Sequence, residues 1–336
     1  MPQNHYGKSS FVVADSFQMK FFEDRSFPYD FSYASGLIYF RDTRISKDGE
    51  DKVQVICNPS TGQYAILPPG LTDRSCLDLL GFDPIEKQYK VFVIYNRGGN
   101  ELVFHILTLG TGKMRWRNIQ CPTNHVPIPR CEGICINGVL YYLAQQTDEW
   151  NEVIVCFDVR SEKFKFLLLQ VEFVKWPTQL INYKGKVGMI LEDGNKRRFP
   201  LKLHIWVLED VGKEELTAYA YTLRDENRVD NGHSILCVAR VTASGEIVLA
   251  NTLYKPYYVY FFNLERNTLR RVEIPEEEKW SWDHRVYYFV DHVEDLRFDV
   301  MKTTYAAKSI SRPEQSTSSS RGDHQVTTVA HEQQDY

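Results

Sequence analysis

The chain has 336 residues, of which 43% are hydrophobic and 13% aromatic, so it holds enough material for a large core and leans toward strand-forming residues. Its formal net charge of -4 provides no basic field of the kind that attracts a phosphate backbone, which argues against a nucleic-acid partner. The N-terminus has no apolar signal core and no apolar run approaches the roughly 20 residues of a membrane helix, so we expect no membrane partner and an intracellular location, in the cytoplasm, the nucleus or both.

The first turn signal along the chain is NPSTG, which lies between two apolar segments. It follows a polar N-terminus at 1–9, which we expect to be disordered, and a strand-like segment at 10–21. Asn58 carries a short side chain that can bond the turn backbone, Pro59 presets φ at the next position, and Gly62 suits the positive φ that closes a four-residue hairpin loop. These residues therefore predict a structural turn between two strands.

The same turn slot recurs through the chain at a nearly constant period. Its positions are Gly62, Gly112, Glu162, Gly212 and Asn267, separated by 50, 50, 50 and 55 residues. Gly and Asn tolerate positive φ at little cost, whereas Glu162 would carry a penalty of about 1 to 2 kcal/mol in this register. A second hairpin, marked by Gly138, Gly185 and Gly245, lies between consecutive turns.

Two hairpins in each period of about fifty residues give four strands, which is the content of one kelch-like β-propeller blade. The rival fold, two packed β-sandwich domains, would not require such regular spacing. The strand-like segments 10–21 and 286–301 are left over, and pairing them would close the ring as a further blade, for about six blades in all. We therefore expect an all-β propeller domain at 10–305. The polar, Ser/Thr-rich remainder at 306–336 predicts a disordered C-terminal tail.

The sequence offers little support for catalysis, a cofactor or a metal site. LGTGKM departs from a phosphate-binding loop at two required positions, and no nucleophile elbow or HExxH motif is present. His284, Asp291 and His292 form the most suggestive polar cluster, but alternation along a strand places Asp291 on the face opposite His292. The seven cysteines are dispersed and form no CxxC pair. We predict no enzyme activity and no cofactor.

A recognition surface is the better candidate, because propeller loops from many blades gather on one face. Trp280, Trp282 and Arg285 lie in a charged stretch between predicted blades, and Trp and Arg are enriched in the energetic centres of interfaces. They are the predicted partner-binding residues. The alternative, that these tryptophans pack between blades, stays open.

Ten segments resemble one family of plant proteins in a fixed order. They are CNPSTGQYAILP, GFDPIEKQYKVFVI, WRNIQC, ICINGVLYYLA, IVCFDVRSEKFKFLLL, LINYKGKVGMI, HIWVLEDV, GEIVLA, FFNLERNTLRRVEI and FVDHVEDL. The order and content resemble the F-box-associated interaction domain, of the type called F-box associated β-propeller type 3, over roughly 10–301.

The resemblance implies a protein-protein interaction module that recognises the substrate of an SCF ubiquitin ligase. In that family an N-terminal F-box of about forty residues docks on a Skp-type adaptor and a cullin, and tethering raises the effective concentration of the attacking lysine. Here only about nine residues precede the first predicted strand, so we expect the F-box to be absent and docking to need an F-box supplied upstream. The substrate protein is unknown. A propeller-fold enzyme or a carbohydrate-binding protein is the alternative.

Overall fold

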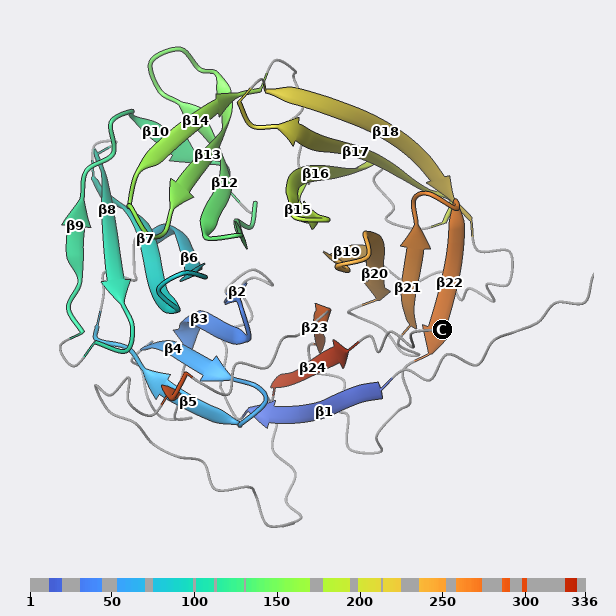
Figure 1. Cartoon of the computed structure of the whole chain (residues 1–336), viewed down its shortest axis with the longest axis horizontal. Coiled ribbons are helices and arrows are strands. Elements are labelled where there is room, and N and C mark those ends of the chain that lie inside the picture. Colours follow the sequence, from blue (N-terminus) through green and yellow to red (C-terminus); the bar gives the residue numbers. More distant parts are fainter. Residues whose placement is uncertain are drawn as a thin grey trace, which may run out of the picture.

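The computed structural model of the chain describes residues 12–19, 31–43, 53–69, 75–98, 101–111, 114–129, 131–169, 178–193, 199–212, 214–224, 236–251, 258–273, 286–290, 298–300 and 324–330. These residues form an all-β propeller in which five antiparallel sheets stand around a ring (Figure 1). The predicted all-β propeller is confirmed, with five blades in the ring, and the alternative of two β-sandwich domains is not what the chain adopts.

The blades follow one another in chain order. Blade 1 contains β2 (Phe31–Ala34), β3 (Leu37–Thr43), β4 (Val53–Asn58) and β5 (Gln63–Ile66). Blade 2 contains β6 (Ser75–Asp83), β7 (Gln88–Gly98), β8 (Glu101–Thr108) and β9 (Arg117–Ile119). Blade 3 contains β10 (His125–Pro127), β11 (Ile134–Ile136), β12 (Val139–Gln146), β13 (Glu152–Asp158) and β14 (Phe164–Leu168). Its inner edge is shared by two short strands, since β10 and β11 both pair with β12.

The last two blades repeat the four-strand order from the axis outward. Blade 4 contains β15 (Thr178–Tyr183), β16 (Lys186–Asp193), β17 (Leu201–Asp210) and β18 (Glu215–Leu223). Blade 5 contains β19 (Leu236–Val241), β20 (Glu246–Asn251), β21 (Tyr258–Asn263) and β22 (Thr268–Glu273).

A sixth sheet lies between blades 5 and 1, and it differs from the predicted sixth blade. It has three strands, β1 (Val12–Met19), β24 (His324–Ala330) and β23 (Val286–Val290), in the order β1-β24-β23. Both ends of the chain enter it, as expected, but β1 and β23 pair with β24 instead of with each other. The pairing of β23 with β24 is parallel, unlike the strand pairs of the five blades.

Strand β24 falls inside the segment 306–336, for which a disordered tail is predicted. The local sequence HQVTTVA explains the strand, because four consecutive β-branched residues favour extended backbone although the surrounding composition is polar. The rest of that segment lies outside the described residues, as do 1–9, so the predicted domain boundaries stay predictions.

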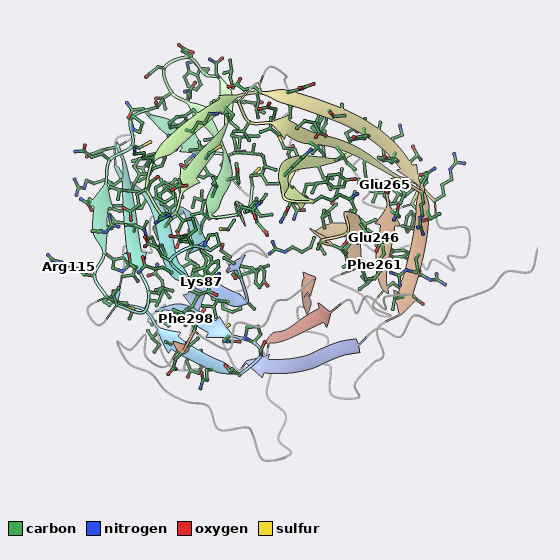
Figure 2. The ribbon with its side chains drawn as sticks, in the orientation of Figure 1. Lys87, Arg115, Glu246, Phe261, Glu265 and Phe298 are labelled. Carbon is green, nitrogen blue, oxygen red and sulfur yellow. The ribbon has the colours of Figure 1, made fainter. Side chains whose placement is uncertain are left out.

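The core lies between the blades. Strand β13, the third of the four main strands of blade 3, is buried at five consecutive positions because it faces a neighbouring blade on each side. Phe92 of blade 2 stacks on Phe157 of blade 3 with ring centroids 4.7 Å apart. Complete burial of such a ring contributes about 1.5 to 3 kcal/mol. Phe298, labelled in Figure 2, packs edge-on against Tyr89 and joins the cluster between blades 1 and 2.

The alternating strand directions give the propeller two unlike ends. The hairpin turns between the first and second strands, and between the third and fourth strands, meet at one end, which we call the turn end. The connections between second and third strands meet at the opposite end, which we call the connection end. These two ends hold the sites described next.

Candidate functional site

The predicted partner-binding residues Trp280, Trp282 and Arg285 lie outside the described residues, between β22 and β23. Their role stays a prediction. The predicted turn residues, in contrast, lie mostly within the described part of the chain, at the turn end of the blades.

The turn that begins at Asn58 has the expected type of closure. Gly62 has φ of 69° and its N–H donates to the carbonyl of Asn58 at 2.9 Å. The N–H of Ser60 donates to Asn58 Oδ1 at 3.0 Å, while Pro59 occupies the next position of the turn. In blade 5 the corresponding positive φ is at Asn267, with a value of 49°. NPSTG is therefore a closed turn between β4 and β5.

Two predicted turn residues do not have this placement. Gly112 lies outside the described residues, and nearby Gly110 has φ of 76°. Gly212 has no positive φ, which in that turn falls at Glu214 with φ of 56°. The reason is an extra residue, since the pairing of β17 with β18 shifts register between Leu208 and Asp210 and moves the left-handed position along the chain.

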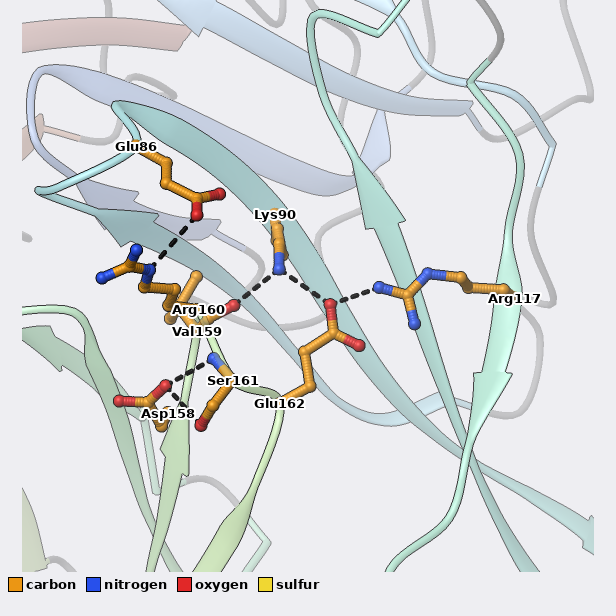
Figure 3. Close-up of polar contacts among 8 residues, drawn as sticks. All are labelled: Glu86, Lys90, Arg117, Asp158, Val159, Arg160, Ser161 and Glu162. Carbon is orange, nitrogen blue, oxygen red and sulfur yellow. Dashed lines mark hydrogen bonds and ion pairs between the residues drawn. The ribbon is translucent and has the colours of Figure 1, made fainter.

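Glu162 occupies the equivalent slot in blade 3 with φ of 59°, and its side chain joins two blades (Figure 3). Lys90 of β7 lies 2.7 Å from Glu162 Oε1, and Arg117 of β9 binds the same oxygen. Lys90 Nζ also donates to the carbonyl of Val159 at 2.7 Å. Only 7% of the Lys90 side chain and 18% of the Glu162 side chain are exposed. The carboxylate thus bridges blades 2 and 3, which explains why a Glu stands where Gly would be less strained.

This charged group is fixed by its partners and is poorly suited to proton transfer. Burial alone would raise the pKa of Glu162, but hydrogen bonds from Arg117 and Lys90 outweigh burial and hold that pKa below its ordinary value. A carboxylate with a lowered pKa and two bound cations is a weak general base near neutral pH. We assign it a structural role.

Sequence reasoning also missed a cysteine beside a histidine in blade 3. Cys121 Sγ lies 3.7 Å from His125 Nδ1, and a thiol beside an imidazole is the pairing of a catalytic nucleophile with its base. His125 Nδ1 lies 2.9 Å from the carbonyl of Thr123, so this nitrogen carries the proton, and Nε2 accepts from the Tyr142 hydroxyl at 2.8 Å. Burial raises the pKa of Cys121 to about 11. The pair holds a neutral thiol and no free base, so it is not an activated nucleophile.

The connection end of blade 3 presents the most exposed large apolar side chain of the described residues. Trp150 lies in the loop between β12 and β13, at residues 147–151, which we call the tryptophan loop. Its side chain is 73% exposed and its φ is 57°, a left-handed backbone that costs a non-glycine residue about 1 to 2 kcal/mol. Within the described part of the chain, no ring contact involves this indole.

Hydrogen bonds hold the backbone of the tryptophan loop in place. The N–H of Gln146 donates to the carbonyl of Asn151 at 2.9 Å, and Thr147 N donates to the carbonyl of Asn124 at 3.2 Å. Asn151 Nδ2 donates to Glu149 Oε2 at 2.7 Å. The indole is therefore displayed on an ordered loop beside an acidic side chain. Trp150 is well placed to insert into a partner.

A sequence signal for Trp150 was available. The polar stretch TDEWN interrupts two apolar runs that form β12 and β13, so an aromatic residue inside it has no core to enter. The prediction of Trp280, Trp282 and Arg285 rested instead on their charged stretch between blades and on the enrichment of Trp and Arg at interfaces.

Other classes of site find little support among the described residues. The residues that the structure describes contain no group of three or more His, Cys, Asp or Glu side chains that could hold a metal ion. Within the same residues, no helix is long and apolar enough to cross a membrane. The cysteines of the described residues form no disulfide.

The fold and its inter-blade contacts define a β-propeller with an exposed aromatic loop. The family model described as F-box associated beta propeller domain matches residues 1–293. The chain therefore belongs to the F-box associated β-propeller family, as its motifs predict, and similar plant proteins agree. The Arabidopsis thaliana protein named F-box protein At1g31080 is 57% identical over 245 residues, covering 72% of this chain and 68% of that protein.

Two further comparisons complete this picture. At1g30920 of Arabidopsis thaliana, whose name includes the words F-box protein, is 52% identical over 322 residues, covering 92% of this chain and 79% of that protein. A solved structure of a protein from Lactobacillus plantarum is 11% identical with a TM-score of 0.40, covering 76% of this chain and 71% of that one. This likeness is too weak to carry an argument about function.

Proposed function

We propose that this chain is a protein-binding module that recognises the substrate of an SCF-type ubiquitin ligase. Membership of the F-box associated β-propeller family supports the proposal, as do relatives named F-box proteins. The module itself contributes no reacting group. It acts by tethering a substrate protein near a charged ubiquitin carrier, which raises the effective concentration of the attacking lysine.

The observation that carries the choice of surface is Trp150. An indole that is 73% exposed on a left-handed backbone costs stability and receives no ring contact in return from the described residues. Trp is among the residue types that dominate binding energy when a partner buries them. The tryptophan loop is thus the proposed contact with the substrate protein.

The proposal has three associated parts. Docking on a Skp-type adaptor and a cullin requires an F-box and belongs to that helical unit, not to the propeller. The three-stranded sheet of β1, β24 and β23 takes the place of a sixth kelch-like blade and closes the ring. Cysteines that form no disulfide among the described residues are consistent with an intracellular location.

A propeller-fold enzyme or carbohydrate binder is the second candidate. It would need polar side chains that converge on the axis or a free nucleophile. The Cys121 and His125 pair, the closest approach to such a set, has its thiol proton in place and its Nδ1 bonded to Thr123. We therefore favour recognition over catalysis.

The test compares partners captured by three tagged forms of the chain in plant cells with the proteasome blocked. The forms are wild type, Trp150→Ala and Ile85→Ala, where Ile85 is a matched control, 69% exposed at the turn end. We expect one set of proteins to be recovered with wild type and Ile85→Ala and to fall at least about tenfold with Trp150→Ala. Equal recovery with all three forms would remove the tryptophan loop from the proposal.

A further inference from the structure

The outer strand of blade 4 differs from the outer strands of the other blades. β18 has nine residues, Glu215–Leu223, and within the described part of the chain it pairs only with β17 (Figure 1). All six residues from Leu216 to Tyr221 are either half-buried or exposed. No residue from Leu216 to Leu223 is charged. It therefore presents a long row of outward-facing backbone groups.

The other blades carry the usual protection of a sheet edge. The outer strands β5 and β9 have four and three residues, and β14 has five with Lys165 at its second position. β22 has six residues and includes Arg270 and Arg271. Short edges and edge charges discourage strand-to-strand association between molecules. β18 is longer than these strands and carries a charge only at its first residue, Glu215.

The central residues of β18 are symmetric about Ala220. Tyr219 and Tyr221 flank it, and the small residues Ala218 and Thr222 come next on either side. An antiparallel copy with Ala220 opposite Ala220 places Tyr219 opposite Tyr221 on one face and small residues on the other. Tyr219 and Tyr221 already lie on one face of β18, with ring centroids 6.5 Å apart. Aromatic cross-strand pairs of this kind stabilise antiparallel sheets.

The charged residues near the ends of the strand are compatible with this arrangement. With Ala220 opposite Ala220, Arg224 of one molecule lies opposite Leu216 of the other. No like charges therefore face each other between Leu216 and Arg224, and the tyrosine placement and the small central residues match a second copy of the same strand.

We propose that β18 is a self-association edge, at which two copies of this chain pair antiparallel about a two-fold axis at Ala220. The two fourth blades then form one continuous sheet. Such an isologous contact uses the same surface on both molecules and closes at the dimer. The contact is small, so a weak dimer is expected, with a Kd of about 10 to 100 µM. This inference is independent of the proposed substrate recognition.

Sedimentation velocity of the purified chain from about 1 to about 200 µM tests the proposal. Wild type is expected to shift from monomer to dimer across this range. Ala220→Lys places two like charges opposite each other at the axis, and we expect its Kd to rise at least about tenfold. Ala220→Glu is expected to behave in the same way. An equimolar mixture of the Lys and Glu variants should dimerise again, which a misfolded edge could not do.

Thr268→Lys is the matched control, because Thr268 is an exposed residue on the outer strand of blade 5. It should dimerise like wild type, and all variants should share the wild-type circular dichroism spectrum. A wild type that stays monomeric at the highest concentration overturns the proposal. A dimer that persists unchanged in Ala220→Lys also overturns it, since another surface would then join the copies.

Discussion

The two ends of the propeller differ in how the side chains of their strained residues are bonded. At the turn end, side chains are bonded to the next blade: Lys90 to the Val159 carbonyl, Lys165 to the Val211 carbonyl, and Lys184 to Glu265. At the connection end, Trp150 extends from its loop with 73% of its side chain exposed. Both ends contain residues of positive φ. At the turn end the strained residues Glu162 and Lys184 form inter-blade ion pairs through their side chains. At Trp150 the backbone carbonyl accepts from Gln145 Nε2 at 3.4 Å, but the indole has no ring contact among the described residues.

This difference indicates which residues stabilise the fold and which are available to bind a partner. A strained residue with internal partners fixes the ring, and its replacement should change the free energy of unfolding. A strained residue without them should change binding and leave unfolding unchanged. The following substitutions test this division, from the largest effect on stability to the smallest.

Glu162→Ala should cause the largest loss of stability. It leaves Lys90 largely buried without its carboxylate, and we expect the free energy of unfolding to fall by about 2 to 3 kcal/mol. Chemical denaturation measures this change. Glu86→Ala is the matched control, because Glu86 is half exposed in its 3.2 Å pair with Arg160 and its loss should cost less than about 0.5 kcal/mol. Equal losses in both variants would contradict the bridging role of Glu162.

Gly62→Val should cost about 1 to 2 kcal/mol, because a β-branched residue is poorly suited to φ of 69°. Gly62→Asn is the control, since Asn267 adopts positive φ at the equivalent turn of blade 5. Thermal unfolding should show a lower Tm for the Val variant than for the Asn variant. Identical Tm values would count against the turn as a source of stability.

His125 should give a smaller effect, visible as a pH dependence. Burial lowers the pKa of His125 below its ordinary value of 6.5, and the hydrogen bond to Thr123 only partly opposes this change. The unfolded chain therefore binds the proton more readily, so stability is complete above pH 6.5 and falls as the pH drops from 6.5 toward the lower folded pKa. Tm should fall between pH 7.5 and 5.5, and by less in His125→Gln than in wild type. A slope unchanged in His125→Gln would assign the pH dependence to other groups.

Trp150→Ala should have the smallest effect on unfolding, less than about 0.5 kcal/mol. Alanine retains the Cβ, so the backbone strain is unchanged, and an exposed ring contributes little packing. Denaturant titration measures the difference. A loss above about 1 kcal/mol would show that the indole packs within the molecule, and the division between the two ends would fail at its most exposed residue.

Much of the fold was predictable because the turns obey local backbone rules. Gly62 and Asn267 mark hairpin closures by residue type alone, and their period exposes the blades. Glu162 did not look like a favourable turn residue, since its stabilising partners, Lys90 and Arg117, come from another blade. Gly212 was misplaced because a register shift at Leu208 is set by pairing with the neighbouring strand.

The candidate site was less predictable for a related reason. Exposure of Trp150 depends on which blade surfaces remain uncovered once the ring assembles, and that is a property of the whole fold. Strand β24 was not predicted because the composition around HQVTTVA is polar, and averaging over a long segment masks its four consecutive β-branched residues.

The sheet that joins the two chain ends has a consequence for synthesis. β1 near the start of the chain pairs with β24, with Val12 opposite Ala330, and in the described part of the chain β24 is the only strand bonded to β1. During translation β1 therefore cannot pair with β24 until almost the whole chain has left the ribosome. Contacts of such large sequence separation form slowly and leave a bare strand edge meanwhile. Closure of the ring is therefore the expected late step of folding.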